Sequence, residues 1–139
     1  MKKIILDCDP GHDDAIAIML ACASSELEVL GITTVAGNQT GEKTFINALK
    51  ILTLIGKNLP VARGFDKPLF QELVTAPEIH GETGLDGADL PAPSIKACDV
   101  HAVNFIIETL LSADEPVYLI PTGPLTNIAG ALLLSPGIK

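Results

Sequence analysis

The sequence predicts an α/β fold, with a mostly parallel β-sheet covered by helices on both faces. Short apolar segments rich in Ile, Val and Leu alternate with longer segments of helical periodicity. Turn-forming Gly, Pro, Asn and Asp residues follow the apolar segments, and we find no internal repeat or domain linker. In such a sheet, ligands bind at the carboxyl ends of the strands, so the polar residues found there are the first candidates for a site.

The amino-terminal half begins with an isoleucine-rich strand and alternates strands with helices. Three apolar segments are expected strands: residues 3–6, 27–35 and 61–62. Residues 13–23 are expected to be a helix that is apolar on nearly every side, which predicts deep packing. Residues 40–55 are a second expected helix, with Thr40 as its N-cap and Gly56 as its carboxy-terminal stop.

The pattern fails over residues 63–97, which are rich in Pro and Gly and have no sustained period. A loop of this length inside a compact domain is uncommon and is often functional. Regular structure returns with an amphipathic helix at residues 99–112, a strand at 117–120 and a helix at 125–134.

Composition excludes several classes of protein. Hydrophobic residues make up 47% of the 139 residues, which is typical of a globular chain and not of a disordered one. The net charge of −8 argues against a nucleic-acid binder, which needs a basic face. Three cysteines without a Cys-x-x-Cys pair predict reduced thiols and a cytoplasmic location, and no apolar run is long enough to span a membrane.

The chemistry of the chain is predicted to lie in residues 7–14, Asp-Cys-Asp-Pro-Gly-His-Asp-Asp. Four carboxylates within eight residues repel one another unless a hard cation with oxygen ligands compensates them. Strand alternation places Asp7 and Asp9 on the same side, whereas Asp13 and Asp14 point about 100° apart on the following helix. Acid pairs at a helix start often only complement the helix dipole, but four acids at a strand end favour a metal site.

Four segments of the chain resemble the inosine–uridine-preferring nucleoside hydrolase family. They are the acidic segment at residues 7–14, Thr-Thr-Val-Ala-Gly-Asn-Gln-Thr at 33–40, His-Gly-Glu-Thr-Gly at 80–84 and Pro-Thr-Gly-Pro-Leu-Thr-Asn at 121–127. The first segment is most similar to that of the bacterial pyrimidine-preferring ribonucleoside hydrolases. The resemblance implies a Rossmann-like nucleoside hydrolase fold and hydrolysis of a ribonucleoside to free base and ribose.

The resemblance also implies a set of metal ligands. Asp9 and Asp14 would bind Ca²⁺ through their carboxylates, and Thr122 would bind it through its backbone carbonyl. Asp9 would in addition act as the general base for a calcium-bound water. Asp7 would orient neighbouring groups and not bind the metal.

Other residues would contact the small-molecule substrate. The resemblance implies that Asp13 and Asn38 bind the ribose hydroxyls. His80 would be catalytic and would lie near the nucleobase and the 5′ side of the ribose. Cys8 is expected to point into the core, His101 to be structural, and His12 is left open between a role in the site and none.

Residues 1–139 are expected to be one nucleoside hydrolase domain that is truncated relative to the family, so its fold would be incomplete. The resemblance implies a homo-oligomer for the full-length family. Two alternatives remain open, the first being a catalytically inactive fragment. The second is a magnesium-dependent phosphatase of the haloacid-dehalogenase type, with Asp7 as nucleophile and Asp9 as acid/base, although Gly11 departs from that motif. Asp86 and Asp89 are expected to be solvated loop charges.

Overall fold

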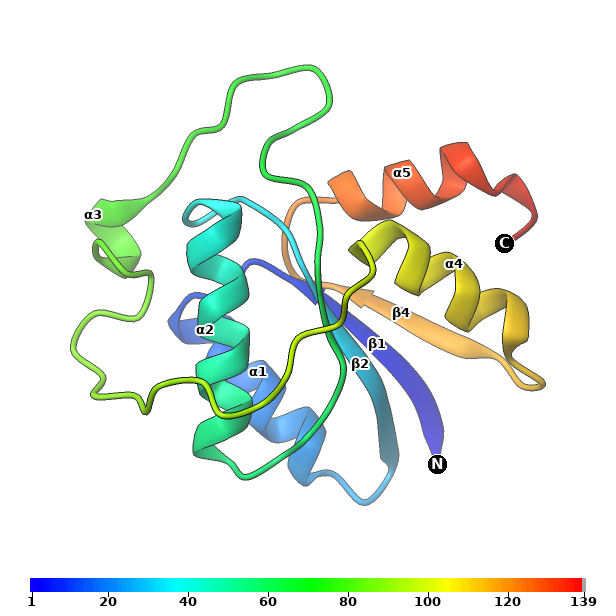
Figure 1. Ribbon diagram of the computed structural model, residues 1–139, viewed down its shortest axis with the longest axis horizontal. Helices are drawn as coiled ribbons and strands as arrows, with labels where there is room; N and C mark the ends of the chain where they lie inside the picture. The colour runs from blue at the N-terminus through cyan, green and yellow to red at the C-terminus, as the bar shows by residue number, and fades with distance from the viewer. Residues whose placement is uncertain (139) are drawn as a thin grey trace.

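The computed structural model describes residues 1–138 and contains a four-stranded sheet in which every neighbouring pair is parallel (Figure 1). The strand order is β3-β2-β1-β4. The strands are β1 (Lys2–Cys8), β2 (Leu27–Thr34), β3 (Val61–Arg63) and β4 (Val117–Pro121). The predicted parallel α/β sheet is confirmed, and each predicted strand lies within two residues of its observed bounds.

Helices cover both faces of the sheet, as predicted (Figure 1). One face carries α1 (His12–Ala23) and α2 (Gly41–Leu54), and the other carries α4 (Ala102–Ser112) and α5 (Thr126–Leu134). The short helix α3 (Pro77–His80) lies in the long connection between β3 and α4, and the 3₁₀ helix η1 (Pro136–Ile138) follows α5.

Local sequence signals account for several helix ends. The side chain of Thr40 accepts a hydrogen bond from the backbone N–H of Lys43, so Thr40 is the predicted N-cap of α2. Gly56 has a φ of 64°, a conformation that glycine adopts readily and that ends this helix. Helix α4 begins three residues later than predicted because the ring of His101 accepts a hydrogen bond from Val103 and caps it. His101 is therefore structural, as expected.

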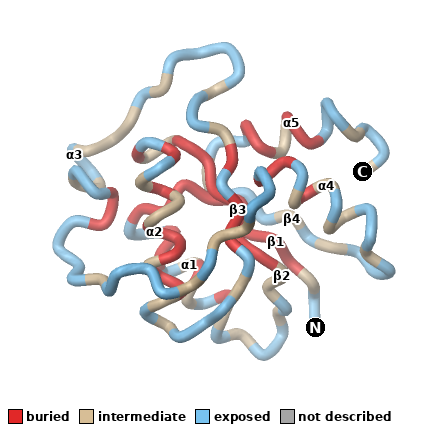
Figure 2. Tube along the Cα trace, viewed as in Figure 1, coloured by how far each residue is buried: buried red, intermediate tan, exposed pale blue. Residues whose placement is uncertain are grey.

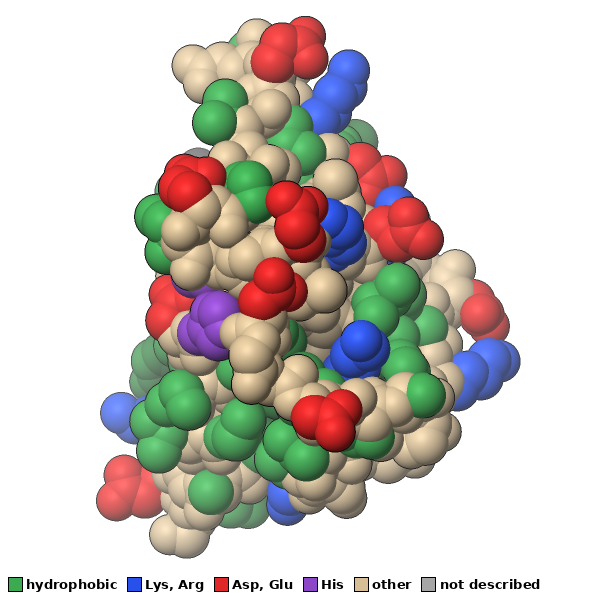
Figure 3. All heavy atoms as spheres, turned by 90° about the vertical axis from the view of Figure 1, so that its left-hand side faces the viewer, with side chains coloured by type: hydrophobic (Ala, Val, Ile, Leu, Met, Phe, Trp, Pro, Cys, Tyr) green, Lys and Arg blue, Asp and Glu red, His purple; other side chains and the backbone are tan. Residues whose placement is uncertain are grey.

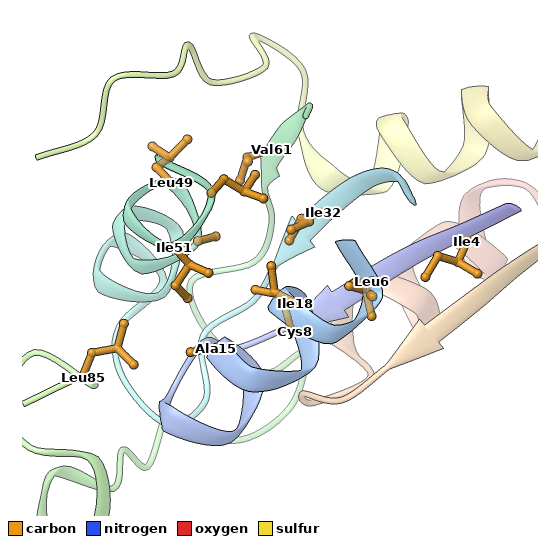
Figure 4. Close-up of a cluster of buried hydrophobic side chains, with 13 residues drawn as sticks. Ile4, Leu6, Cys8, Ala15, Ile18, Ile32, Leu49, Ile51, Val61 and Leu85 are labelled. Atoms are coloured by element: carbon orange, nitrogen blue, oxygen red, sulfur yellow. The ribbon is translucent and has the colours of Figure 1, made fainter. Parts of the chain in front are cut away.

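The larger hydrophobic core lies between the sheet and helices α1 and α2 (Figures 2 and 4). Ile18, Ile32, Ile51 and Val61 are at most 1% exposed there. Cys8 belongs to the same core, which confirms its predicted orientation. A smaller core on the opposite face joins α4 to α5 through residues that include Val103, Ile106 and Ala131.

The prediction that α1 is deeply packed on nearly every side is wrong. Ile16 and Leu20 are 55% and 67% exposed. These positions are four residues apart and lie on one side of the helix, which the described part of the chain leaves uncovered. Periodicity reports that a side chain is apolar, but it does not report whether a neighbouring element covers it.

Strand β4 lies at an edge of the sheet. Within residues 1–138 it pairs with β1 alone, so its outer backbone groups have no partner strand. Tyr118 and Ile120 alternate with the half-buried Leu119 and are 48% and 38% exposed. No helix among the described residues is both long and apolar enough to cross a bilayer.

Candidate active site

Three loops that carry predicted site residues meet at the carboxyl edge of the sheet. The backbone N–H of Val35 donates to the carbonyl oxygen of Cys8 at 3.0 Å, which continues the pairing of β1 and β2 beyond the strands. The N–H of Thr122 donates to the carbonyl oxygen of Asp7 at 2.9 Å on the other side. The exits of β2, β1 and β4 therefore lie side by side, as expected for a parallel sheet.

Asp9 lies at the centre of this edge and is 6% exposed. Its Oδ2 accepts a hydrogen bond of 2.7 Å from the backbone N–H of Asn38. The Asn38 side chain donates in turn to the Asp9 carbonyl oxygen at 3.2 Å. A Cβ at Gly37 would lie 2.2 Å from Oδ2, and one at Gly123 would lie 2.7 Å from Oδ1. Both glycines therefore leave the space that the Asp9 carboxylate occupies.

Asp14 lies beside Asp9 in the first turn of α1 and is 3% exposed. Its Oδ2 accepts a 3.1 Å hydrogen bond from the backbone N–H of Asp9. Asp13, the next residue along, is exposed and does not join the buried pair. The helix start thus directs one acid inward and the other toward solvent, as the 100° spacing predicts.

The buried pair lacks a cationic partner. No Lys, Arg or His within residues 1–138 forms an ion pair with Asp9 or Asp14. The pKa of Asp9 is raised to about 6, mainly by burial and also by the nearby Asp14, while the hydrogen bond from Asn38 opposes the rise. Burial also raises the pKa of Asp14, and the hydrogen bond from Thr122 opposes this change.

Asp7 is completely buried and links β1 to β2 and α5 through hydrogen bonds. Its Oδ1 accepts hydrogen bonds from Thr33 Oγ1 at 2.6 Å and from Asn127 Nδ2 at 2.8 Å. Asn127 also donates to the Thr34 carbonyl oxygen and accepts from the N–H of Phe65. Burial raises the pKa of Asp7, and both side-chain hydrogen bonds oppose the rise. A carboxylate enclosed in this way cannot serve as an accessible nucleophile, which removes the main support for the phosphatase alternative.

Sequence reasoning identified Asp7 but missed its two partners. Thr33 and Asn127 both belong to segments on which the family resemblance rests, so their positions were available as signals. Strand alternation predicted that Asp7 and Asp9 share a side of β1. The two carboxyl groups nevertheless have different partners, because Asp9 lies beyond the end of the strand at Cys8.

The two histidines of the predicted site lie against each other. His12 and His80 stack with ring centroids 5.7 Å apart and ring planes 20° apart. His80 Nδ1 is buried and has no hydrogen-bond partner among the described residues, and a Cβ at Gly11 would lie 2.6 Å from it. His12 is exposed, and its Nε2 is 2.9 Å from the carbonyl oxygen of Asp86. His12 thus contacts the segment that carries His80.

Figure 3 views the side of the molecule that carries α3 and shows a surface histidine with acidic side chains near it. Asp86 is exposed, as expected, but it is more than a solvated charge. Its carboxylate accepts hydrogen bonds from the backbone N–H groups of Glu82 and Thr83 and from the Thr83 hydroxyl. These hydrogen bonds lower the pKa of Asp86.

The residues present fit a hard cation in part. Two buried, uncompensated carboxylates with backbone carbonyls nearby are the oxygen donors that calcium prefers. Among residues 1–138, however, no group of three or more His, Cys, Asp or Glu side chains is placed to hold a metal ion. Calcium takes about six to eight oxygen ligands, so the pair at Asp9 and Asp14 would supply only a portion of its shell.

Comparisons with known proteins identify the family of this chain. The family described as inosine-uridine preferring nucleoside hydrolase matches residues 4–139. The chain is 59% identical over 129 residues to the pyrimidine-specific ribonucleoside hydrolase RihA of Photobacterium profundum, which covers 92% of this chain and 42% of that protein. It is 50% identical to the pyrimidine-specific ribonucleoside hydrolase RihB of Escherichia coli, over 99% of this chain and 44% of that protein.

Solved structures give the same result. The purine-preferring ribonucleoside hydrolase from Gardnerella vaginalis superimposes with a TM-score of 0.93 at 38% identity, over 99% of this chain and 45% of that one. The chain therefore spans less than half the length of each of these three relatives.

Proposed function

Because this chain belongs to the inosine–uridine-preferring nucleoside hydrolase family, we propose that it contributes to an enzyme that hydrolyses the N-glycosidic bond of ribonucleosides to free base and ribose. The chain spans about two fifths of the length of its relatives, so the activity is proposed for the domain to which residues 1–139 belong. Relatives at 50–59% identity are named pyrimidine-specific, and we propose uridine and cytidine as the first substrates to test.

The buried pair of Asp9 and Asp14 is the observation that carries this proposal. Two desolvated carboxylates without a cationic side chain are costly to hold in the charged state. A calcium ion held by both carboxylates and by the Thr122 carbonyl oxygen would remove that cost. When bound, such an ion supplies a positioned and polarised water at the site.

We propose that Asp9 acts as the general base. The N–H of Asn38 fixes Oδ2, and the glycine backbone at residue 123 leaves room beside Oδ1. In the proposed reaction Asp9 takes a proton from the attacking water as the oxygen bonds to C1′. The bond from C1′ to the base nitrogen breaks, and its electron pair leaves with the nucleobase. Carboxylates near the ribose stabilise the positive charge that builds on the sugar.

Substrate contacts are proposed for three further residues. Asp13 is exposed beside the buried pair and would accept hydrogen bonds from ribose hydroxyls, together with Asn38. A 2′-deoxyribonucleoside would leave one of these groups unpaired and would be rejected. His80 would meet the nucleobase side, and its unpartnered ring nitrogen is consistent with a polar ligand there.

Release of reducing sugar from uridine, cytidine and inosine in the presence of calcium tests the proposal. The expected result is sugar release that is lost in Asp9→Asn and retained in Asp99→Asn, a surface control. The side chain of Asp99 is 87% exposed and forms an ion pair with Lys96. Lack of release from every nucleoside by residues 1–139 would favour the inactive-fragment alternative for this chain, and lack of release by the whole domain would refute the proposed activity.

Calcium binding can be measured separately from activity. A cation that binds the folded chain raises its unfolding midpoint, and the midpoint should rise with calcium in the wild type but not in Asp9→Asn. Homo-oligomerisation and a cytoplasmic location are further proposals for the full-length enzyme. Size-exclusion chromatography with light scattering tests the first, and cell fractionation tests the second.

A further inference from the structure

The His80 loop, defined here as residues 76–88, has an ordered shape that internal hydrogen bonds maintain. The Asp86 carboxylate accepts from the N–H groups of Glu82 at 2.9 Å and Thr83 at 3.0 Å. Three glycines with positive φ, at residues 81, 84 and 87, allow the tight turns that this geometry needs. The loop therefore has a defined internal shape that can be positioned as a whole.

Leu85 anchors this loop in the larger hydrophobic core. It is 5% exposed, and Figure 4 shows its side chain pointing toward the core residues of α1 and α2. Burial of Leu85 holds the loop against the core, but apolar contacts are not directional and do not orient the polar groups of the loop.

Asn47 can orient the loop, because its side chain forms hydrogen bonds both to the loop and to the acidic segment. Its Nδ2 donates to the carbonyl oxygen of Thr83 at 2.8 Å and to the carbonyl oxygen of Pro10 at 3.1 Å. Asn47 comes from the middle of α2 and is 3% exposed. Pro10 directly follows the proposed base Asp9, so a single buried amide connects the backbones on the two sides of the site.

The His80 ring packs closely against the backbone of the acidic segment. A Cβ at Gly11 would lie 2.6 Å from His80 Nδ1, so the ring rests directly on the backbone that follows Pro10. A second contact, from Gln39 Nε2 to the carbonyl oxygen of Gly81 at 2.8 Å, holds the residue after His80. The separation between the His80 ring and the acidic segment thus depends on side chains of α2 and of the loop before it.

We propose that Asn47 is a positioning residue, which sets the place of His80 relative to the acidic segment by bridging Pro10 and Thr83. It touches no reacting group in this proposal and acts only through the two backbones. The catalytic importance of that position rests on the proposed function, whereas the position itself does not.

The three histidines of the chain provide a direct measurement. Their ring C–H resonances can be recorded by NMR and assigned by replacing one histidine at a time. In Asn47→Leu, the resonances of His80 and His12 should shift, because the ring stacking of these two residues changes. The resonance of His101, which caps α4 and contacts Phe65, should stay in place. A residue that only added stability would leave all three folded-state shifts unchanged.

Hydrogen exchange gives a second readout. Loss of the two Asn47 hydrogen bonds, one buried and one partly buried, should speed exchange at the amides of residues 82–86 by about tenfold or more, while amides of the β1 core change less. Asn104→Leu, at an exposed position of α4, is the matched control. Asn47→Ser, which is smaller and keeps one donor, should shift the same two histidines by a smaller amount and serves if Asn47→Leu does not fold.

Unchanged His80 and His12 resonances in a folded Asn47 variant would overturn the proposal, and so would exchange that rises equally throughout the chain. Failure of nucleoside hydrolysis would leave the histidine shifts as they are. The two proposals can therefore fail independently.

Discussion

Replacing Asp9 by Asn should stabilise the cation-free protein near neutral pH and prevent its stabilisation by calcium. The reason lies in the position of the carboxylate, which is 6% exposed, next to Asp14 and without a cationic partner in the described chain. Asn has nearly the same shape, its side-chain oxygen can accept the hydrogen bond from Asn38, and it carries no charge.

The magnitude follows from the pKa of Asp9. A folded-state pKa of about 6, against an ordinary value of 3.8, corresponds to an upper limit of about 3 kcal/mol for the charged form. Because Asp13 and Thr122 beside the pair are exposed, solvent screens part of this, and we expect about 1–2 kcal/mol.

The pH dependence has a definite sign. A carboxyl group whose pKa is raised by folding binds its proton more tightly in the folded state. The favourable contribution is therefore present below about pH 4 and is lost as the pH rises through about 6. The variant cannot titrate at this position, so its advantage over the wild type should be greatest at about pH 7 and should vanish near pH 4.

Urea unfolding of both proteins at several pH values, with a chelator present, measures this difference, and Asp99→Asn controls for net charge. In saturating calcium the wild type should be more stable than Asp9→Asn, because only the wild type can bind the cation with both carboxylates. If the variant is less stable than the wild type at about pH 7 without calcium, or if the difference does not change with pH, the proposed burial of an uncompensated charge is refuted.

Two further substitutions probe the surroundings of the pair. Gly123→Ala should lower the free energy of unfolding by about 1–3 kcal/mol, because the new Cβ would lie 2.7 Å from Asp9 Oδ1. The calcium-dependent rise in the unfolding midpoint should become smaller for the same reason. Gly137→Ala is the control, since Gly137 has open space around it. Asn127→Ala should cost about 2–4 kcal/mol in urea unfolding, because it leaves the buried carboxylate of Asp7 without one of its two donors; a loss below about 0.5 kcal/mol would contradict that role.

The sequence predicted the fold well because the strands are short apolar segments that end in clear turn residues. Residues 3–6 and 117–120 became β1 and β4 with small changes of bounds, and Thr40 capped α2 as expected. These features depend on local chemistry, which a single sequence displays directly. The bounds of α4 were less accurate, because a histidine ring is an unusual N-cap.

Features that depend on distant contacts could not be predicted in the same way. The four acids were recognised, but only the structure shows that Asp7 bonds to Thr33 and Asn127, 26 and 120 residues away. The link between Asn47 and Thr83 joins the middle of a helix to a segment without periodicity, so no local pattern announces it. Apolar periodicity likewise gave no sign that Ile16 would be exposed.

The outer side of β4 has a practical consequence for every experiment on this polypeptide. A strand whose outer donors and acceptors are unpaired within the described residues, flanked by the apolar side chains of Tyr118 and Ile120, can act as a template for another extended chain. Two copies could meet there without any change in their interiors. Such self-association grows with protein concentration, so unfolding midpoints and exchange rates are best compared across a dilution series, in which true properties of the single chain stay constant.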